Sequence, residues 1–213
     1  MLGKISFLYL FLLFPCFQQT NPDLVIIKHS NFTTTFSKSK NYPIMVEWWV
    51  TKSKITCKEP HKRENSFKPD PKLSWDTKFN DDYLNSGYDR GHMCPAADNL
   101  CLTKNILEET FFFSNISPQQ HALNAGDWLT LETLTRELAE RNDSVHVWSG
   151  NLGEIKKIKD VSVPTQCWKV IHIKKTNKWE AYLFENNKSK ADGIIDNKVQ
   201  LSKIESLTGL KFK

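Results

Sequence analysis

Five segments of the chain are rich in β-branched and aromatic residues, a composition that favours β-strands. They are residues 24–29 (LVIIKH), 43–55 (PIMVEWWVTKSKI), 144–150 (SVHVWSG), 166–175 (QCWKVIHIKK) and 178–186 (KWEAYLFEN). The last two are predicted to form a hairpin with Thr176-Asn177 as its turn. Apart from the first segment, the pattern of residues 21–41 is irregular and predicts no element.

The clearest helical pattern covers residues 127–142, DWLTLETLTRELAERN. Its apolar face is formed at i, i+3, i+7 spacing by Leu131, Leu134 and Leu138. Glu132 and Arg136 have the i,i+4 spacing and the order of a stabilising ion pair on a helix surface. Two shorter helices are predicted from Thr103 (TKNILEETFFF) and over residues 201–207.

The predicted elements indicate the fold class. Residues 57–85 contain three prolines and many lysines and are predicted to be a long loop, a feature that is usually functional in a compact domain. Strands and helices are mixed without the regular alternation of a doubly wound fold. We therefore expect a single α+β domain with a central, mostly antiparallel sheet flanked by helices.

The N-terminal residues differ from the rest of the chain. Lys4 precedes an almost wholly apolar run over residues 5–17, and residues 18–22 are polar. This run is too short to span a bilayer and has the layout of a secretory signal. We expect residues 1–19 to be a signal peptide and residues 20–213 the functional domain of an exported protein; a buried N-terminal strand or helix is the alternative. Cys16 leaves open a lipoprotein-type cleavage, which would anchor the protein to the cell envelope.

Composition and charge add little to this interpretation. A chain of 213 residues with 39% hydrophobic and 25% charged residues is typical of a globular domain and excludes a disordered or fibrous protein. Without Lys4, 28 basic and 24 acidic side chains remain, a net charge of +4. A mild excess of this kind is only a weak indication of a polyanionic partner.

Four cysteines remain after the predicted cleavage. An even number in an exported chain favours disulfides, and four cysteines allow three pairings. Cys94 and Cys101 are close enough in sequence to bridge a short loop, which would leave Cys57 to pair with Cys167. A zinc site is disfavoured because the chain contains no Cys-x-x-Cys pair.

The stretch YDRGHMCPAADN, residues 88–99, brings ionisable side chains together. An imidazole titrating near neutrality can serve as a general base, which makes His92 a candidate for that role. Gly91 permits backbone geometry that other residues resist. Asp89 and Arg90 flank apolar sequence, which indicates that they have partners. A surface turn with a chance histidine is the alternative.

A second polar cluster follows three phenylalanines. It consists of Asn115, Gln119, Gln120, His121 and Asn124. Amide oxygens can ligate a hard cation such as Mg²⁺, which keeps several waters and takes few protein ligands. Asn124 has helix capping as its alternative role, and Glu132 has the ion pair with Arg136. His121 is a second candidate for the general base.

Three motifs, YDRGHMCPAADN (88–99), SNISPQ (114–119) and LNAGDWLTLE (123–132), follow in an order that resembles the DNA/RNA non-specific endonuclease family of ββα-metal (His-Me finger) nucleases. The likeness continues through VPTQCWKVI (163–171) and IESLTGL (204–210). It is loose before Pro43 and between Cys57 and Ser86. The resemblance implies a ββα-metal finger within the expected fold.

The resemblance also implies roles for individual residues. His92 matches the general base that activates water, and Asn124 matches the single protein ligand of Mg²⁺, with Mn²⁺ as the alternative ion. Glu132 matches a residue that hydrogen-bonds the waters of the metal ion. Asp89 is then expected to orient the motif and not to react. Asn115 matches an asparagine that supports the histidine and the phosphate.

Three arginines complete the implied site. Arg136 matches an arginine near the phosphate, and Arg90 matches the arginine of the first motif. Arg63 is the best match for a further arginine in a loop that aligns poorly. Cys94 departs from the apolar or small residues expected there; a disulfide at Cys94 would make activity redox-sensitive.

The expected function is that of an exported, Mg²⁺-dependent endonuclease that binds DNA and RNA through phosphate contacts and leaves 5′-phosphate ends. The alternatives are a catalytically decayed nucleic-acid-binding protein on the same scaffold and a metal-independent phosphodiesterase or phospholipase. No second catalytic histidine or nucleophile motif supports the last of these. Neither a protein inhibitor nor an oligomeric state follows from the residues.

Overall fold

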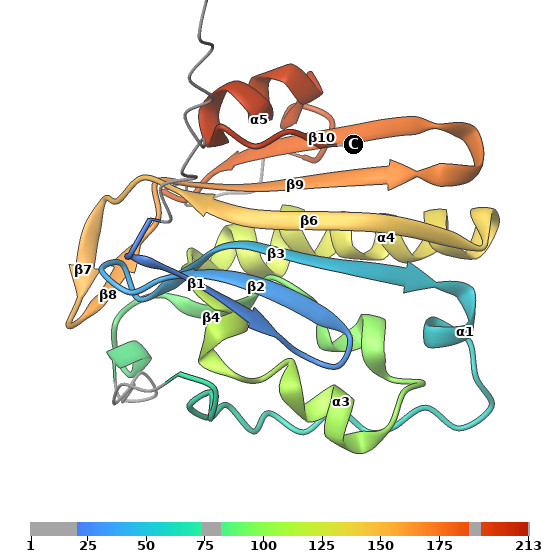
Figure 1. Ribbon diagram of the computed structural model, residues 1–213, viewed down its shortest axis with the longest axis horizontal. Helices are drawn as coiled ribbons and strands as arrows, with labels where there is room; N and C mark the ends of the chain where they lie inside the picture. Colours follow the sequence, from blue (N-terminus) through green and yellow to red (C-terminus); the bar gives the residue numbers. More distant parts are fainter. Residues whose placement is uncertain (1–20, 74–81, 188–192, 213) are drawn as a thin grey trace, which may run out of the picture.

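The computed structural model describes residues 21–73, 82–187 and 193–212, and its centre is a seven-stranded antiparallel sheet (Figure 1). The strand order is β1-β2-β3-β6-β9-β10-β11. These strands are β1 (Leu24–Lys28), β2 (Phe32–Ser37), β3 (Tyr42–Thr51), β6 (Ser144–Leu152), β9 (Gln166–Ile173), β10 (Lys178–Glu185) and β11 (Lys198–Val199). The expected α+β domain with an antiparallel sheet is confirmed.

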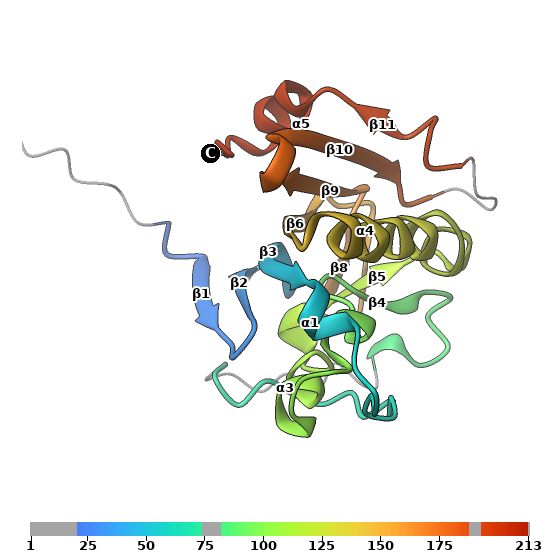
Figure 2. The same ribbon diagram turned by 90° about the vertical axis from the view of Figure 1, so that its right-hand side faces the viewer.

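The two faces of the sheet carry different helices (Figure 2). Helix α4 (Leu129–Asn142) packs on one face, where Leu131 and Ala139 join a core with Val46 and Val147. Helix α5 (Leu201–Thr208) packs on the other face, with Ile204 against Trp168 and Trp148. The alternation of side chains along each strand therefore supplies both cores.

The candidate site is built on a smaller unit beside the α4 face. Strand β4 (Asp89–His92) pairs antiparallel with β5 (Ile116–Gln119), and His92 lies opposite Ile116. The chain then passes through a π-helical turn, Leu123–Trp128, and continues directly into α4. This β4–β5–α4 arrangement is the ββα unit that the resemblance implied. Further elements are α1 (Lys52–Ile55), α3 (Lys104–Glu109), the ribbon β7 (Lys156–Ile158) with β8 (Val161–Val163), and the 3₁₀ turns Ala96–Asn99, Phe113–Asn115 and Lys174–Thr176.

Most of the predicted elements are confirmed, with corrections at their ends. The strand predicted over residues 43–55 ends at Thr51 and is followed by the single turn of α1. The predicted hairpin turn is wider, because a 3₁₀ turn at Lys174–Thr176 precedes Asn177, whose φ is 51°. The prediction of no element between the first two strands is wrong: β2 lies there and buries Phe32 and Phe36.

The guessed disulfide pairing is also wrong. Cys57 pairs with Cys101, and Cys94 and Cys167 are buried and free. Cys101 lies beside α1, where its N–H donates to the carbonyl of Lys54 at 3.3 Å, so it meets Cys57 just beyond that helix. The sulfur of Cys94 points into the core, which removes the basis for a redox-sensitive bond at that residue.

The predicted signal peptide, residues 1–19 with Cys16, lies outside the described residues. Among the residues that the structure describes, no helix combines the length and the apolar character needed to cross a membrane.

Candidate active site

The residues singled out in the sequence meet at one pocket of about 250 Å³. Charged and amide side chains occupy its walls, together with small apolar groups from the segment that follows His92. The lining residues are Arg63, Arg90, His92, Pro95, Ala96, Ala97, Asn124, Ala125, Leu129, Glu132 and Arg136. Six of the seven predicted site residues therefore line a single pocket, and Asn115 is the exception.

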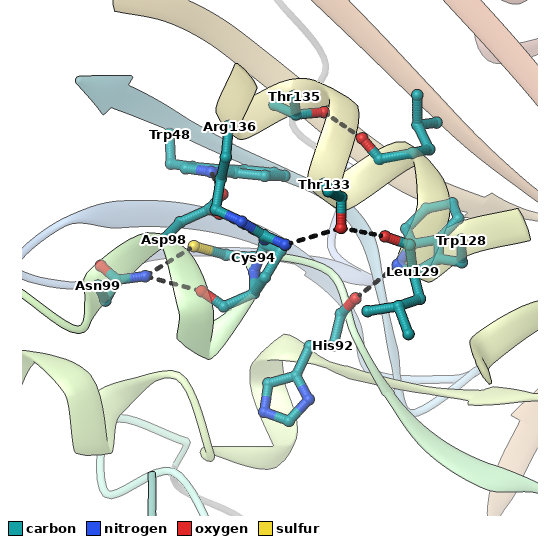
Figure 3. Close-up of polar contacts among 12 residues, drawn as sticks. Trp48, His92, Cys94, Asp98, Asn99, Trp128, Leu129, Thr133, Thr135 and Arg136 are labelled. Carbon is teal, nitrogen blue, oxygen red and sulfur yellow. Dashed lines mark hydrogen bonds and ion pairs between the residues drawn. The ribbon is translucent and has the colours of Figure 1, made fainter. Parts of the chain in front are cut away.

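His92 is the last residue of β4 and is almost fully buried, with 6% of its surface exposed. Trp128 donates its indole N–H to the carbonyl oxygen of His92 at 3.1 Å (Figure 3), and the edge of the imidazole packs against Phe111. Nε2 has no hydrogen-bond partner among the described residues. Burial, assisted by the charge of Arg63, lowers the pKa of His92 to about 3. The imidazole is therefore neutral at physiological pH and able to accept a proton.

Gly91 is needed for space and not for unusual backbone angles. Its φ is outside the positive range, contrary to the expectation from sequence. A Cβ atom at Gly91 would lie 2.0 Å from Oε1 of Gln119, a fully buried side chain on the paired strand β5. Any larger residue would therefore have to displace the buried side chain of Gln119 next to His92.

Asn115 does not line the pocket, and its side chain holds the backbone just after His92 through hydrogen bonds. Its Oδ1 accepts from the N–H of Cys94 at 2.9 Å, and its Nδ2 donates to the carbonyls of Cys94 and Thr110 at 2.9 and 2.8 Å. The side chain is fully buried, and all these groups are used within the protein. These bonds agree with the expected support of the histidine segment, and the expected contact of Asn115 with phosphate stays a prediction.

Asp89 orients Asn124. Its Oδ2 accepts from Nδ2 of Asn124 at 2.9 Å and also contacts Nδ1 of His121 at 2.8 Å. Because the amide nitrogen is fixed in this way, Oδ1 of Asn124 is left as an acceptor at the pocket. Asn124 lies within the π-helical turn and does not cap α4. His121 is 80% exposed and lies outside the pocket, which disfavours it as the base.

The donor set of the pocket fits a divalent cation with few protein ligands. Oδ1 of Asn124 and the carboxylate of Glu132 line the same space. No cluster of three or more His, Cys, Asp or Glu side chains suited to a metal exists among residues 21–73, 82–187 and 193–212. Hard cations such as Mg²⁺ prefer oxygen ligands and retain water, so one amide oxygen beside one carboxylate is a suitable pair.

Glu132 projects from the first turn of α4, and burial raises its pKa to about 7. The positive charge of Lys169 opposes this effect and favours the anion. The predicted ion pair between Glu132 and Arg136 is wrong. Arg136 donates instead to Oδ1 of Asp98 at 3.2 Å and to Thr133 at 3.1 Å (Figure 3).

Asp98 therefore determines where the guanidinium group of Arg136 lies. The carboxylate is 1% exposed, and Trp48 donates its indole N–H to Oδ2 at 2.9 Å. A buried carboxylate held by two donors forms a fixed anchor for an arginine. The side chain of Arg136 is 22% exposed and still lines the pocket.

Arg63 and Arg90 approach the pocket over aromatic rings. The guanidinium carbon of Arg63 lies 5.8 Å from the ring centroid of Phe111, and that of Arg90 lies 5.3 Å from Phe67. Such cation–π contacts restrict the movement of the long side chains. The loop that aligned poorly in sequence thus brings Arg63 to the same pocket as His92.

The disulfide bond tethers the loop that carries Arg63. Cys57 begins this loop, and its bond to Cys101 joins it to the segment that follows the 3₁₀ turn Ala96–Asn99. The N–H of His61 donates to the carbonyl of Leu100 at 2.8 Å, which fixes the next turn of the loop. The covalent bond and this hydrogen bond together hold the chain two residues before Arg63.

Replacing both cysteines, Cys57→Ser with Cys101→Ser, is expected to weaken substrate binding and the fold. Opening a cross-link that spans 44 residues costs roughly 4 kcal/mol in the chain-entropy account. A freed Arg63 loop should raise the KM for the expected nucleic-acid substrate several-fold while kcat changes less, as steady-state kinetics would show. Reductant should act on the wild type in the same direction and leave the variant unchanged. A wild type with unaltered KM after complete reduction would contradict this role.

The sequence did not reveal the buried residues that support the site through hydrogen bonds. Trp48, Asp98 and Trp128 form hydrogen bonds that fix His92 or Arg136. Asp98 had one available signal, a carboxylate within the apolar stretch PAAD. The two tryptophans had none, because an indole at an inward-facing position is usually only part of the core.

Comparisons with known proteins agree with this geometry. The DNA/RNA non-specific endonuclease family model matches residues 17–213. Human nuclease EXOG, mitochondrial, is 34% identical over 209 residues, covering 86% of this chain and 55% of that protein. The nuclease of Serratia marcescens is 30% identical over 201 residues, covering 87% of this chain and 73% of that protein.

Among solved structures, a chain of the EndoG/EndoGI complex, determined to explain EndoG inhibition, matches with a TM-score of 0.77 and 29% identity. The match covers 88% of this chain and 84% of that chain. The chain spans about half the length of the curated EXOG relatives that it matches.

Proposed function

The chain belongs to the DNA/RNA non-specific endonuclease family, and from this premise we propose that it hydrolyses phosphodiester bonds within DNA and RNA with the help of a divalent cation. The observation that carries the proposal is the single pocket in which a neutral histidine, a free amide oxygen, a carboxylate and three arginines meet. Hydrolysis of a phosphodiester needs a base for water, positive charge around the phosphate and stabilisation of the leaving alkoxide.

His92 is the proposed base. Its imidazole is neutral at pH 7 because burial disfavours the charged form, so Nε2 is free to take a proton from an attacking water. A phosphate anion in the pocket would stabilise the resulting imidazolium ion, since a neighbouring opposite charge favours the charged form. Asn115 and Trp128 keep the backbone of His92 in place while the proton moves.

The arginines are proposed to bind the phosphate. Arg63, Arg90 and Arg136 approach the pocket from three separate segments, so their charges surround the bound group. A guanidinium group donates two hydrogen bonds to phosphate in a fixed geometry. Asp98 limits the movement of Arg136, which lowers the cost of ordering that side chain on binding.

Mg²⁺ is the proposed cofactor, with Mn²⁺ as its alternative. Oδ1 of Asn124 would hold the ion, and Glu132 would add a carboxylate on the same side of the pocket. The bound cation would supply the charge that stabilises the phosphoryl oxygens and the leaving alkoxide. Asp89 keeps the amide of Asn124 turned for this purpose.

Low sequence specificity follows from the lining of the pocket. Apart from the charged and amide groups, the walls consist of Pro95, Ala96, Ala97, Ala125 and Leu129. These side chains have no hydrogen-bonding groups with which to read base edges, and contacts to phosphate carry no base information. We therefore propose that both DNA and RNA are substrates, with 5′-phosphate ends as products.

The decisive experiment incubates purified protein with supercoiled plasmid and with a structured RNA, in Mg²⁺, in Mn²⁺ and in EDTA. We expect cleavage of both substrates with either ion and none in EDTA. Binding of both substrates without cleavage under any of these conditions would overturn the proposal in favour of a decayed nucleic-acid-binding protein. The presence of His92, Asn124 and Glu132 in one pocket argues against that alternative.

We further propose that the protein acts outside the cytoplasm, as a secreted, periplasmic or lipid-anchored enzyme. The Cys57–Cys101 bond supports this, because structural disulfides are typical of oxidising compartments. Mass spectrometry of the protein recovered from its native host would locate the mature N-terminus and any lipid on Cys16. An intact N-terminus on a protein retained in the cytoplasm would overturn the proposal.

A further inference from the structure

His29, Ser30 and Asn31 join β1 to β2 and form the tip of this hairpin, which lies next to α3 (Figure 1). The N–H of His29 donates to the carbonyl of Phe32 at 2.8 Å, which closes the turn. None of the three tip residues lines the active-site pocket. Each of their side chains nevertheless contacts a different segment far along the chain, and the closing of a hairpin requires no such contacts.

His29 contacts a buried carboxylate in the loop that carries Arg63. Its Nε2 lies 3.1 Å from Oδ2 of Asp70, and both side chains are fully buried. Ser114 donates its hydroxyl to the same oxygen at 2.5 Å, and the N–H of Lys72 donates to Oδ1 at 2.9 Å. Burial raises the pKa of Asp70, but these three donors outweigh it and hold the pKa below its ordinary value. Asp70 is therefore an anion that is held at both of its oxygens.

Asp70 fixes the part of this loop that packs against the proposed general base. The ring centroid of Phe67 lies 5.4 Å from that of His92, and the guanidinium carbon of Arg90 lies 5.3 Å from the same phenyl ring. The disulfide bond tethers the start of the loop. Asp70 is thus a second fixed point, and Arg63 lies between the two.

Asn31 is connected to a different wall of the pocket. Its Nδ2 donates to Oδ1 of Asn99 at 2.5 Å, and Nδ2 of Asn99 donates in turn to the carbonyl of Pro95 at 3.0 Å. Asn99 is fully buried, and Pro95 lines the pocket. Asp98, the residue before Asn99, is the anchor of Arg136. The two linked amides therefore connect the hairpin tip with the segment that places Arg136.

Ser30, between these two residues, contacts a part of the protein outside the pocket. Its N–H and its hydroxyl donate to the carboxylate of Glu109 on α3 at 2.8 and 3.0 Å, in an exposed position. Glu109 does not line the pocket. The same tip thus has two side chains linked to the site and a third that can serve as a control.

We propose that His29 and Asn31 are positioning residues of the active site: one fixes the loop that carries Arg63, and the other fixes the segment that anchors Arg136. Both act through buried polar side chains, and neither would touch the substrate. The proposal rests on the nuclease function proposed above. It gives residues before Pro43, where the resemblance to the family is loose, a part in binding the phosphate.

Asn31→Asp separates positioning from stability. The new carboxylate keeps the acceptor that Nζ of Lys54 uses at 2.5 Å and loses the donor to Asn99. We expect the melting temperature to stay near that of the wild type, because the carboxylate can also pair with the charge of Lys54. The KM for a fluorescent oligonucleotide should rise about three- to tenfold and kcat should change less than about twofold, since a displaced arginine binds the phosphate less well.

Double-mutant cycles supply a readout that a merely structural role would not move. In an Arg136→Ala background, Asn31→Asp should change KM by less than about twofold, because the side chain that it positions is absent. His29→Ala should raise KM about three- to tenfold in the wild type and less than about twofold in an Arg63→Ala background. His29→Gln keeps an N–H donor near Asp70 and should bring KM back toward the wild-type value.

Hydrogen exchange of the substrate-free protein tests both residues without turnover. We expect His29→Ala to speed exchange mainly within residues 57–73 and Asn31→Asp mainly within residues 94–101, each by about fivefold or more. Ser30→Ala is the matched control and should change neither exchange nor KM, since it removes one exposed hydrogen bond.

Wild-type exchange and KM in either folded variant would overturn the role of that residue, and effects of Ser30→Ala as large as theirs would overturn the proposal. Losses fully additive with Arg63→Ala and Arg136→Ala would also overturn it, because they would indicate a general loss of stability. If His29→Ala does not fold, Ser114→Ala removes the other side-chain donor to the same oxygen and takes its place, with the same expected result and the same refuting one. A wild type that does not cleave nucleic acid would instead contradict the proposed function, and hydrogen exchange would still decide whether the hairpin tip fixes these segments.

Discussion

Replacing His92 by alanine is expected to reduce cleavage of plasmid DNA by roughly 10²–10⁴-fold, the contribution of a positioned general base. The imidazole is the only histidine side chain at the pocket among the described residues, and its pKa near 3 keeps it in the proton-accepting form. The loss should appear in kcat and much less in KM, because Arg63, Arg90 and Arg136 still bind the phosphate. Steady-state cleavage of a fluorescent oligonucleotide in Mg²⁺ measures both constants.

His121→Ala is the matched control, since it removes the exposed imidazole of the other candidate base, three positions before Asn124. We expect its kcat to stay within about tenfold of the wild type, as it loses only a contact to Asp89. Wild-type kcat in a folded His92→Ala protein would refute the mechanism. So would a larger loss in His121→Ala than in His92→Ala.

The His92→Ala variant also tests whether the imidazole of His92 is neutral in the folded protein. The folded pKa of about 3 lies below the ordinary value of 6.5, so the unfolded chain binds this proton more readily. The contribution of neutral His92 to the free energy of unfolding should therefore be fully present above pH 6.5, and the wild type should lose stability as the pH falls from 6.5 toward 3. Denaturant unfolding of His92→Ala should show a weaker dependence on pH over this range.

The fold could be predicted where the residue pattern of a segment by itself indicates a helix or a strand. Helix α4 follows from the spacing of Leu131, Leu134 and Leu138, and β3 follows from a run of β-branched and aromatic residues. Strand β2 was missed although Phe32, Thr34 and Phe36 alternate with half-buried positions, because three threonines and flanking lysines resemble a polar loop. Its partners β1 and β3 provide the hydrogen bonds that the local sequence does not show.

The residues that line the candidate site could be predicted from the sequence, whereas the buried residues that hold them in place could not. His92, Asn124 and Glu132 stand in motifs whose order indicates a function, and all three line the pocket. Trp48 comes from β3 and contacts Asp98 across 50 positions of the chain, and the contact of Trp128 with His92 spans 36 positions. Lys169 on β9 illustrates the limit, because it is fully buried in the structure, whereas a lysine in a strand is expected to face solvent.

Asn124→Ala is expected to remove most of the metal-dependent activity, because Oδ1 of Asn124 is the one amide oxygen that the pocket offers to a cation. Losing several kcal/mol of charge stabilisation in the transition state corresponds to a decrease of about 10²–10³-fold in kcat at saturating substrate. Electron paramagnetic resonance of Mn²⁺, with a non-hydrolysable oligonucleotide present, measures binding of the ion independently of turnover. Affinity for Mn²⁺ should fall in parallel with kcat.

Two further variants serve as comparisons for Asn124→Ala. Asn142→Ala makes the same substitution at the last residue of α4, where Nδ2 donates to the carbonyl of Leu138 at 2.9 Å, and should leave kcat and Mn²⁺ affinity unchanged. Asp89→Ala keeps Asn124 but removes the carboxylate that holds its amide, so its loss of kcat should be intermediate and partly reversed by a higher Mg²⁺ concentration.

If Asn124→Ala binds Mn²⁺ as the wild type does, the ion is held by other groups, and the assignment of Asn124 fails even if activity is lost. If Asp89→Ala matches Asn142→Ala, the orientation of the amide does not depend on Asp89, because the fold of the π-helical turn is then sufficient to hold Asn124 in place.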